Sequence, residues 1–256
     1  MKKLITNIPS SRCFRNLLVI VWLSITYRAH AQSTQLWADY TLNLPFSNSY
    51  LFSSEFSYHT IISKESKWRE VEINPIIQWS IDRHIDVLFS LKVSSTLQRE
   101  DYNSDELRPA LGMRYHFTPQ RRVQLRGLLQ VEQRNLYHQE SSTWAHSLRT
   151  RFRVESLIPI NKKTIFENRL LYGLIDAEIF WVLDKQLDER YANQLRFRAG
   201  MGYRSSYTWR FEVIYTDQYS RNNLEQGFQQ VSNIFRVRIK HFLNKAKPAT
   251  HDPNHN

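Results

Sequence analysis

The amino-acid sequence predicts an all-β fold, an antiparallel transmembrane β-barrel of about 12 strands, with about 10 to 12 compatible with the pattern. Three observations predict this fold. Apolar and polar residues alternate with period two through most of the chain, which is the signal of β-strands. The N-terminus resembles a leader for export. In three runs, at residues 148–154, 195–199 and 235–240, arginine alternates with apolar residues, so each predicted strand has a cationic face and an apolar face.

Residues 1–31 have the three parts of a secretory signal peptide. Basic residues precede an apolar run at 17–25, and Ala29-His30-Ala31 fits the small-x-small cleavage pattern. The apolar run is far shorter than the roughly 20 residues that a membrane-spanning helix needs. We therefore expect cleavage after Ala31 rather than anchoring. Cleavage removes Cys13, the only cysteine, and with it any disulfide or thiol chemistry.

The composition excludes some classes of protein. The formal net charge is +11, but five of the cations lie in the leader, which contains no acidic residue (Lys2, Lys3, Arg12, Arg15 and Arg28). The other basic residues follow strand alternation rather than a basic helix, which argues against nucleic acid as a partner. The mean hydropathy of −0.53 excludes a helical membrane protein but not a barrel, since only every second residue of a barrel strand faces lipid. An aromatic content of 13 % suits interfacial girdles, and six glycines are few for the turns of a β-sandwich.

The first half of the mature chain predicts six strands. In residues 70–81, for example, Val71, Ile73 and Ile77 share one face, and Glu70 and Glu72 share the other. The same alternation predicts strands at residues 36–44, 52–59, 70–81, 86–94, 106–117 and 123–132.

The second half continues the pattern, with predicted strands at residues 144–155, 163–174, 194–203, 209–215 and 231–242. Residues 178–183 fit either a short strand or the end of the preceding one, so the count is twelve or eleven. Breaker residues predict short turns at 45–49, 82–84, 118–120 and 159–162, and longer polar loops at 99–105, 134–142, 184–190 and 220–229. If the first strand rises from the periplasm, the short turns lie where barrels carry long loops, and the sequence leaves this conflict open. The barrel is expected over residues 32–243, and a disordered polar tail over 244–256.

The polar face of these strands mixes cations with carboxylates. Inside a barrel such side chains can pair across strands and hold one another in place. The other interpretation is the solvated outer face of an ordinary sheet, and alternation alone does not separate the two. We predict an interior polar network that includes Arg149, Arg151, Arg153, Arg196, Arg198, Arg236, Arg238, Glu72, Glu155, Glu167 and Glu212.

The chain resembles the bacterial outer-membrane proteins grouped as domain of unknown function 2490. The resemblance lies in Trp37 shortly after the leader, in Glu178-Ile-Phe180, and in the motif Gln194-x-Arg196-x-Arg198-x-Gly200-x-Gly202-Tyr203. It covers most of the mature chain. It implies an outer-membrane β-barrel, and it brings no established activity and no catalytic residues.

The sequence favours a non-enzymatic barrel, either a narrow pore or a structural membrane protein, in the outer membrane of a Gram-negative bacterium. If a path stays open, the excess of interior arginine would favour anions. Outer-membrane lipids and the barrel insertion machinery are the expected partners, with Phe242 as the terminal aromatic residue.

Two other functions remain open. One is a barrel-embedded lipid hydrolase, for which Ser57 with His59, or His146 with Ser147, are the available pairs, although neither has a clear orienting acid or amide. The other is a soluble periplasmic β-sandwich that binds a ligand. No cofactor or metal is expected, because the sequence has no Gly-rich phosphate loop and no Cys/His ligand cluster. His251 and His255 lie in the polar tail, where solvated side chains are expected. In Asp82-x-His84, the aspartate is expected to cap a turn.

Overall fold

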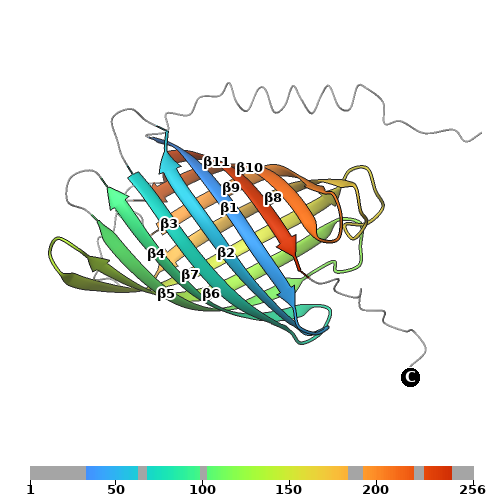
Figure 1. Ribbon diagram of the computed structural model, residues 1–256, viewed down its shortest axis with the longest axis horizontal. Coiled ribbons are helices and arrows are strands. Elements are labelled where there is room, and N and C mark those ends of the chain that lie inside the picture. Colours follow the sequence, from blue (N-terminus) through green and yellow to red (C-terminus); the bar gives the residue numbers. More distant parts are fainter. Residues whose placement is uncertain (1–32, 63–67, 99–102, 184–192, 222–227, 244–256) are drawn as a thin grey trace, which may run out of the picture. The chain divides into compact units, whose positions relative to one another are not determined.

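The computed structural model describes residues 33–62, 68–98, 103–183, 193–221 and 228–243. The described residues form eleven strands that close into one barrel (Figure 1). The leader and the polar tail lie outside the described residues. The strands are β1 (Ser33–Pro45), β2 (Tyr50–Ile61), β3 (Trp68–Ser80), β4 (Ile85–Gln98), β5 (Ser104–His116), β6 (Gln124–His138), β7 (Thr143–Pro159), β8 (Leu170–Val182), β9 (Asn193–Arg204), β10 (Trp209–Arg221) and β11 (Gln229–Phe242).

Consecutive strands pair antiparallel around the barrel, and β1 closes it against β11 in parallel. These two strands lie side by side in Figure 1, with Trp37 opposite Arg236 and Asp39 opposite Arg238. The prediction of a wholly antiparallel barrel was wrong at this seam. In an up-and-down barrel with an odd number of strands, the first and last strands point the same way, so their pairing must be parallel.

The strand count is eleven because residues 163–174 and 178–183 do not form two separate strands. Strand β8 begins at Leu170 and runs through Glu178 to Val182. The preceding residues form a turn in which Arg169 has a positive φ of 54° and its carbonyl accepts a hydrogen bond from Asn161 Nδ2 at 3.0 Å. Leu171 N in turn donates to Asn161 Oδ1 at 2.8 Å. The turn predicted at 159–162 therefore extends to Arg169, and the alternation of apolar residues that predicted a strand from residue 163 continues across it.

The barrel has two rims that differ modestly in their connections. The first rim holds the start of β1 and the connections 62–67, 99–103, 139–142, 183–192 and 222–228; the second holds the end of β11 and the connections 46–49, 81–84, 117–123, 160–169 and 205–208. Four-residue turns predominate at the second rim. The predicted long loop at 134–142 is mostly strand, since β6 continues to His138. With eleven strands the two ends of the barrel chain lie at opposite rims.

A short turn at the second rim is capped as expected. Asp82 Oδ1 accepts hydrogen bonds from the backbone N–H groups of His84 and Ile85, at 2.6 and 2.8 Å. These bonds hold the pKa of the Asp82 carboxyl below its ordinary value. The aspartate thus stabilises the turn, as Asp commonly does at this position.

The two faces of the barrel are inverted relative to a soluble protein. Among the described residues, the buried side chains comprise ten hydrophobic and twenty-six polar or charged ones. Forty-three large hydrophobic residues are exposed, and most of them point outward from the strands. Val213 is 63 % exposed, Leu111 60 % and Val71 58 %. A soluble sandwich would place this set of residues between two sheets.

Exposed tryptophans lie only near the rims in the part of the chain that the structure describes. Trp79 and Trp209 lie towards the second rim, and Trp144 and Trp181 towards the first. Other aromatic rings lie beside these tryptophans. At the second rim, for example, Tyr50 stacks on Trp79 with ring centroids 6.3 Å apart. No described helix is long and apolar enough to cross a bilayer.

Candidate functional site

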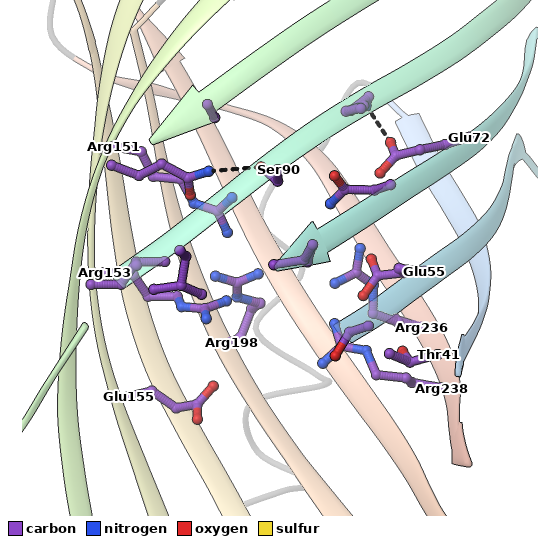
Figure 2. Close-up of a pocket in the computed structure, with 18 of the residues that line it drawn as sticks. Thr41, Glu55, Glu72, Ser90, Arg151, Arg153, Glu155, Arg198, Arg236 and Arg238 are labelled. Carbon is purple, nitrogen blue, oxygen red and sulfur yellow. Dashed lines mark hydrogen bonds and ion pairs between the residues drawn. The ribbon is translucent and has the colours of Figure 1, made fainter. Parts of the chain in front are cut away.

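The barrel encloses a lumen, which we define as its internal cavity of about 1450 Å³. The residues that line it reach from Ser33 and Gln218 near the first rim to Asn48 and Phe242 near the second. They include sixteen lysine and arginine residues and nine carboxylates. Figure 2 shows part of this lining, where arginine side chains from several strands project into the same space.

Glu178 on β8 is the centre of the first ion-pair cluster. Its side chain is wholly buried, and its carboxylate contacts Arg151 directly. Arg198 Nη2 lies 2.9 Å from Glu178 Oε2, and Arg196 Nη1 lies 3.7 Å from the same oxygen. The neighbouring Asp176 accepts a hydrogen bond from Arg198 Nε at 2.5 Å. Two carboxylates therefore hold three guanidinium groups on the wall of β7, β8 and β9.

Asp39 on β1 is the centre of a second ion-pair cluster, at the seam where β1 pairs with β11. Its Oδ2 lies 3.0 Å from Arg236 Nε and 3.3 Å from Arg238 Nε, both on β11. Glu212 on β10 extends the cluster, since it lies 3.4 Å from Arg238 Nη1 and accepts a hydrogen bond from Lys240 Nζ at 2.8 Å. These charge-assisted bonds tie the first strand to the last two.

Two further carboxylates organise the opposite wall. Glu132 on β6 accepts a hydrogen bond from Arg149 Nη2 at 2.5 Å and lies 3.8 Å from Arg108 Nη1. Glu106 on β5 accepts from Arg108 Nη2 at 2.6 Å and from Arg134 Nε at 2.7 Å. Each of these two carboxylates again forms ion pairs with more than one arginine.

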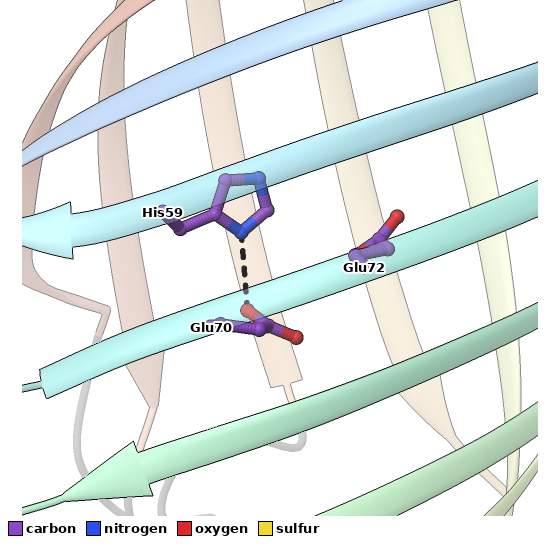
Figure 3. A group of neighbouring side chains, drawn as sticks. All are labelled: His59, Glu70 and Glu72. Atoms are coloured by element: carbon purple, nitrogen blue, oxygen red, sulfur yellow. Dashed lines mark hydrogen bonds and ion pairs between the residues drawn. The ribbon is translucent and has the colours of Figure 1, made fainter.

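A histidine and two glutamates gather near the first rim (Figure 3). One ring nitrogen of His59 and one oxygen from each of Glu70 and Glu72 lie within 4.8 Å of one another, a spacing that suits a divalent metal ion. Lys92, however, lies 3.2 Å from Glu70 Oε1 and contacts Glu72 directly. This ammonium group pairs with both carboxylates, so the chain supplies a cation of its own here.

Three carboxylates of the lumen wall lie deeper than the arginines they pair with. Asp39, Asp176 and Glu178 have side chains at most 3 % exposed, and none of the three lines the cavity. Their arginine partners do line it. The surface that a solute would meet is therefore more basic than the whole interior, because three negative charges are covered by guanidinium groups.

The sequence matches the model of a known protein family over most of its length. Residues 34–229 match the family described as protein of unknown function (DUF2490). The chain belongs to this family. No curated protein matches the sequence.

The lumen of this DUF2490 protein contains most of the residues predicted for the interior network. Arg149, Arg151, Arg153, Arg196, Arg198, Arg236, Arg238, Glu72, Glu155 and Glu212 all line the cavity. Glu167 does not. It lies in the turn before β8, where its Oε1 accepts hydrogen bonds from Thr164 N at 3.0 Å and Lys163 N at 3.1 Å. These backbone donors hold the pKa of Glu167 below its ordinary value.

The carboxylates at the centres of the clusters were missing from the predicted network. Asp39 and Glu132 lie on polar strand faces and could have been included on that ground. Asp176 and Glu178 lie where the sequence left the end of a strand undecided, so their facing was not predicted. Glu178 nevertheless belongs to the segment Glu178-Ile-Phe180, on which the resemblance to the DUF2490 family partly rests.

Aromatic rings provide a second kind of partner for the lumen arginines of the DUF2490 barrel. Arg149 and Arg196 lie 4.4 and 5.0 Å from the centroid of the Phe180 ring. Arg236 lies 4.5 Å from the ring of Trp37, which also stacks on His59 with centroids 4.0 Å apart. Such cation–π contacts stabilise guanidinium groups without neutralising them.

The pairs considered for lipid hydrolysis do not assemble a nucleophile in the described part of the DUF2490 barrel. Ser57 is buried and its Oγ has no hydrogen-bond partner, while His59 is engaged with Glu70 at 3.1 Å. His146 faces outward and hydrogen-bonds Asn135 Oδ1 through Nδ1 at 2.8 Å. Ser147 is buried on the other face of β7, so its hydroxyl points away from His146.

Proposed function

We propose that this protein is an integral barrel of the bacterial outer membrane, and that its lumen is a narrow passage that favours anions. The chain would be exported, lose its leader near Ala31 and insert with lipid around the strands. The observation that carries the proposal is the inversion of its faces, with ionised side chains inside and large apolar ones outside.

The exposed apolar surface supports a lipid environment. Soluble monomers rarely expose contiguous apolar patches larger than a few hundred Å². Here the exposed hydrophobic residues come from all eleven strands of the described barrel, so the patch encircles it. A closed barrel also satisfies its backbone groups between neighbouring strands, as a bilayer requires. Tryptophans near both rims fit two membrane–water interfaces.

The lumen supports a passive role rather than a catalytic one. The sixteen cationic residues that line it exceed the nine carboxylates, and a basic excess attracts anions and repels cations. No described hydroxyl is hydrogen-bonded to His59 or His146, as a serine nucleophile would be to its base.

We infer the orientation of the barrel in the membrane from the lengths of the connections at the second rim. Outer-membrane barrels carry their short turns in the periplasm, and three of the five connections at the second rim are four residues long (46–49, 81–84 and 205–208). The end of β11, with Phe242 for recognition by the insertion machinery, would then lie in the periplasm. The start of β1 would lie outside the cell.

This orientation predicts a difference between two epitope tags. A tag placed before Ser33, after the cleavage site, should be labelled by antibody on intact cells. A tag placed after Leu243 should be labelled only after the outer membrane is permeabilised. The expected contrast follows from the parallel seam between β1 and β11, which sets the two ends of the barrel at opposite rims. Equal labelling of both tags on intact cells would contradict it.

Conductance measurements in planar bilayers test whether the lumen is an open passage. We expect the refolded mature protein to conduct in KCl, with a reversal potential under a salt gradient that shows chloride to be more permeant than potassium. Arg153→Gln should reduce the preference for chloride by removing a cation that lines the lumen. A preference for potassium would contradict the proposal. No conductance at any voltage would eliminate the passage and leave a closed membrane barrel, which fractionation into the outer membrane tests separately.

A further inference from the structure

Arg153 is an arginine of the lumen wall that has no ion pair among the described residues. It lies on β7 directly opposite Glu178 in the strand register and lines the cavity. Yet no carboxylate oxygen of the described chain lies within ion-pair distance of its guanidinium. Glu178 is engaged by Arg151 and Arg198, and Glu155, the other nearby carboxylate, contacts Arg126.

Several charged side chains surround Arg153 in the middle of the lumen, and the cationic ones come from different strands. Its charged neighbours are Arg151, Arg198, Glu155 and Glu178. Arg198 in turn has Arg238 of β11 as a charged neighbour. In Figure 2 the guanidinium groups of Arg153 and Arg198 project into the same space, and those of Arg236 and Arg238 flank it. Arg198 Nη2 is buried and makes no aligned hydrogen bond, although it lies near Glu178.

Three of the nearby carboxylates do not line the lumen, whereas Glu155 and Glu55 do. Asp176 and Glu178 lie behind Arg198, and Asp39 lies behind Arg236 and Arg238. Like charges that face one another are costly unless an anion lies between them. A guanidinium group has five N–H donors and no acceptor, so Arg153 needs acceptor oxygens from outside the chain.

We propose that Arg153, Arg198 and Arg238 bind a phosphate-bearing anion in the middle of the lumen. The three arginines approach from β7, β9 and β11, and thus from different directions around the wall. A tetrahedral oxyanion presents oxygens on all sides and accepts from such a set, whereas a planar carboxylate accepts mainly along one edge. The inference rests on the proposed function in that the lumen must admit solutes.

The test is calorimetric titration of the refolded mature chain in detergent with inorganic phosphate. The wild type should bind, and Arg153→Gln should weaken the binding about tenfold or more, because each charge-assisted hydrogen bond contributes strongly. Arg210→Gln is the matched control. Arg210 also lines the lumen without an ion pair in the described residues, but it stacks on Phe242 near the second rim, 4.5 Å from the ring. Its loss should leave the affinity unchanged within error.

Other anions test the chemical class. Sulfate should compete with phosphate, and succinate, which carries two charges on planar groups, should bind more weakly. Succinate binding as tight as phosphate binding would overturn the assignment. So would an absence of phosphate binding, or an equal loss in Arg153→Gln and Arg210→Gln, which would indicate diffuse attraction. If Arg153→Gln fails to fold, as judged by gel mobility before and after boiling, Arg153→Lys keeps the charge and should still bind measurably more weakly than Arg210→Lys.

The two proposals can fail separately. Phosphate binding in a protein that does not enter the outer membrane would refute the proposed function and leave the site standing. Chloride-selective conductance without phosphate binding would refute the site and leave the passage standing.

Discussion

Replacing Leu111 by arginine is expected to destabilise the barrel by about 2–4 kcal/mol when it folds into lipid vesicles. Leu111 lies in the middle of β5, is 60 % exposed, and has Phe89 and Val131 as its cross-strand neighbours. If these residues face hydrocarbon, a guanidinium group at this depth loses its hydration. If they face water, a surface substitution changes stability by only about 0.5 kcal/mol or less. Urea titration of vesicle-bound protein measures the difference.

The matched control is Ile81→Arg. Ile81 is 52 % exposed and follows β3 immediately, at the second rim. At the depth of an interface the same substitution should cost only about 0–1 kcal/mol. Similar small effects at Leu111 and Ile81 would show that lipid does not cover the outward face, and the outer-membrane proposal would then be abandoned.

The second large effect is expected in the lumen. Glu178→Gln should destabilise the barrel by about 3–5 kcal/mol, because removing one member of a buried ion-pair cluster leaves the others uncompensated. Glu178 is 1 % exposed and lies within 4.0 Å of Arg151, Arg196 and Arg198. Urea midpoints, followed by the change of gel mobility on boiling, report the loss.

Glu55→Gln is the control for this effect. Glu55 also lines the lumen, but it has no ion pair within 4.0 Å among the described residues. Its replacement should cost about 1 kcal/mol or less. The double variant Arg151→Gln with Glu178→Gln should cost less than the sum of the single variants, because each has already removed the other's partner. Additive costs, or equal costs at Glu55 and Glu178, would contradict a stabilising cluster.

Alternation predicted the facing of the strands well, since it is a local property. Arg149, Arg151 and Arg153 lie two residues apart, so one strand carries all three towards the same side. The same rule placed Arg196 with Arg198, and Arg236 with Arg238, and all of them line the lumen. The alternation rule failed at Glu167, which lies in a turn. A turn need not interrupt the alternation of apolar residues, so the pattern did not distinguish it from a strand.

The pairing of charges could not be predicted in this way. Arg151 contacts Glu178, 27 residues further along the chain, through the register of β7 against β8. Arg238 lies 3.3 Å from Asp39, 199 residues away, only because the barrel closes between β1 and β11. The parallel seam itself depended on whether residues 163–174 and 178–183 form one strand or two. The structure has a single strand there, β8, and the number of strands is therefore odd.

The sequence by itself determined that this is an all-β chain and which side chains share a face, because a strand alternates its side chains whatever surrounds it. It also determined the basic excess of the polar face. Only the tertiary structure decided that this face is the inside of a closed, eleven-stranded barrel, which carboxylate neutralises which arginine, and that Arg153 has no carboxylate partner among the described residues. Those features depend on register and closure, which bring together residues far apart in the chain, and no local pattern encodes them.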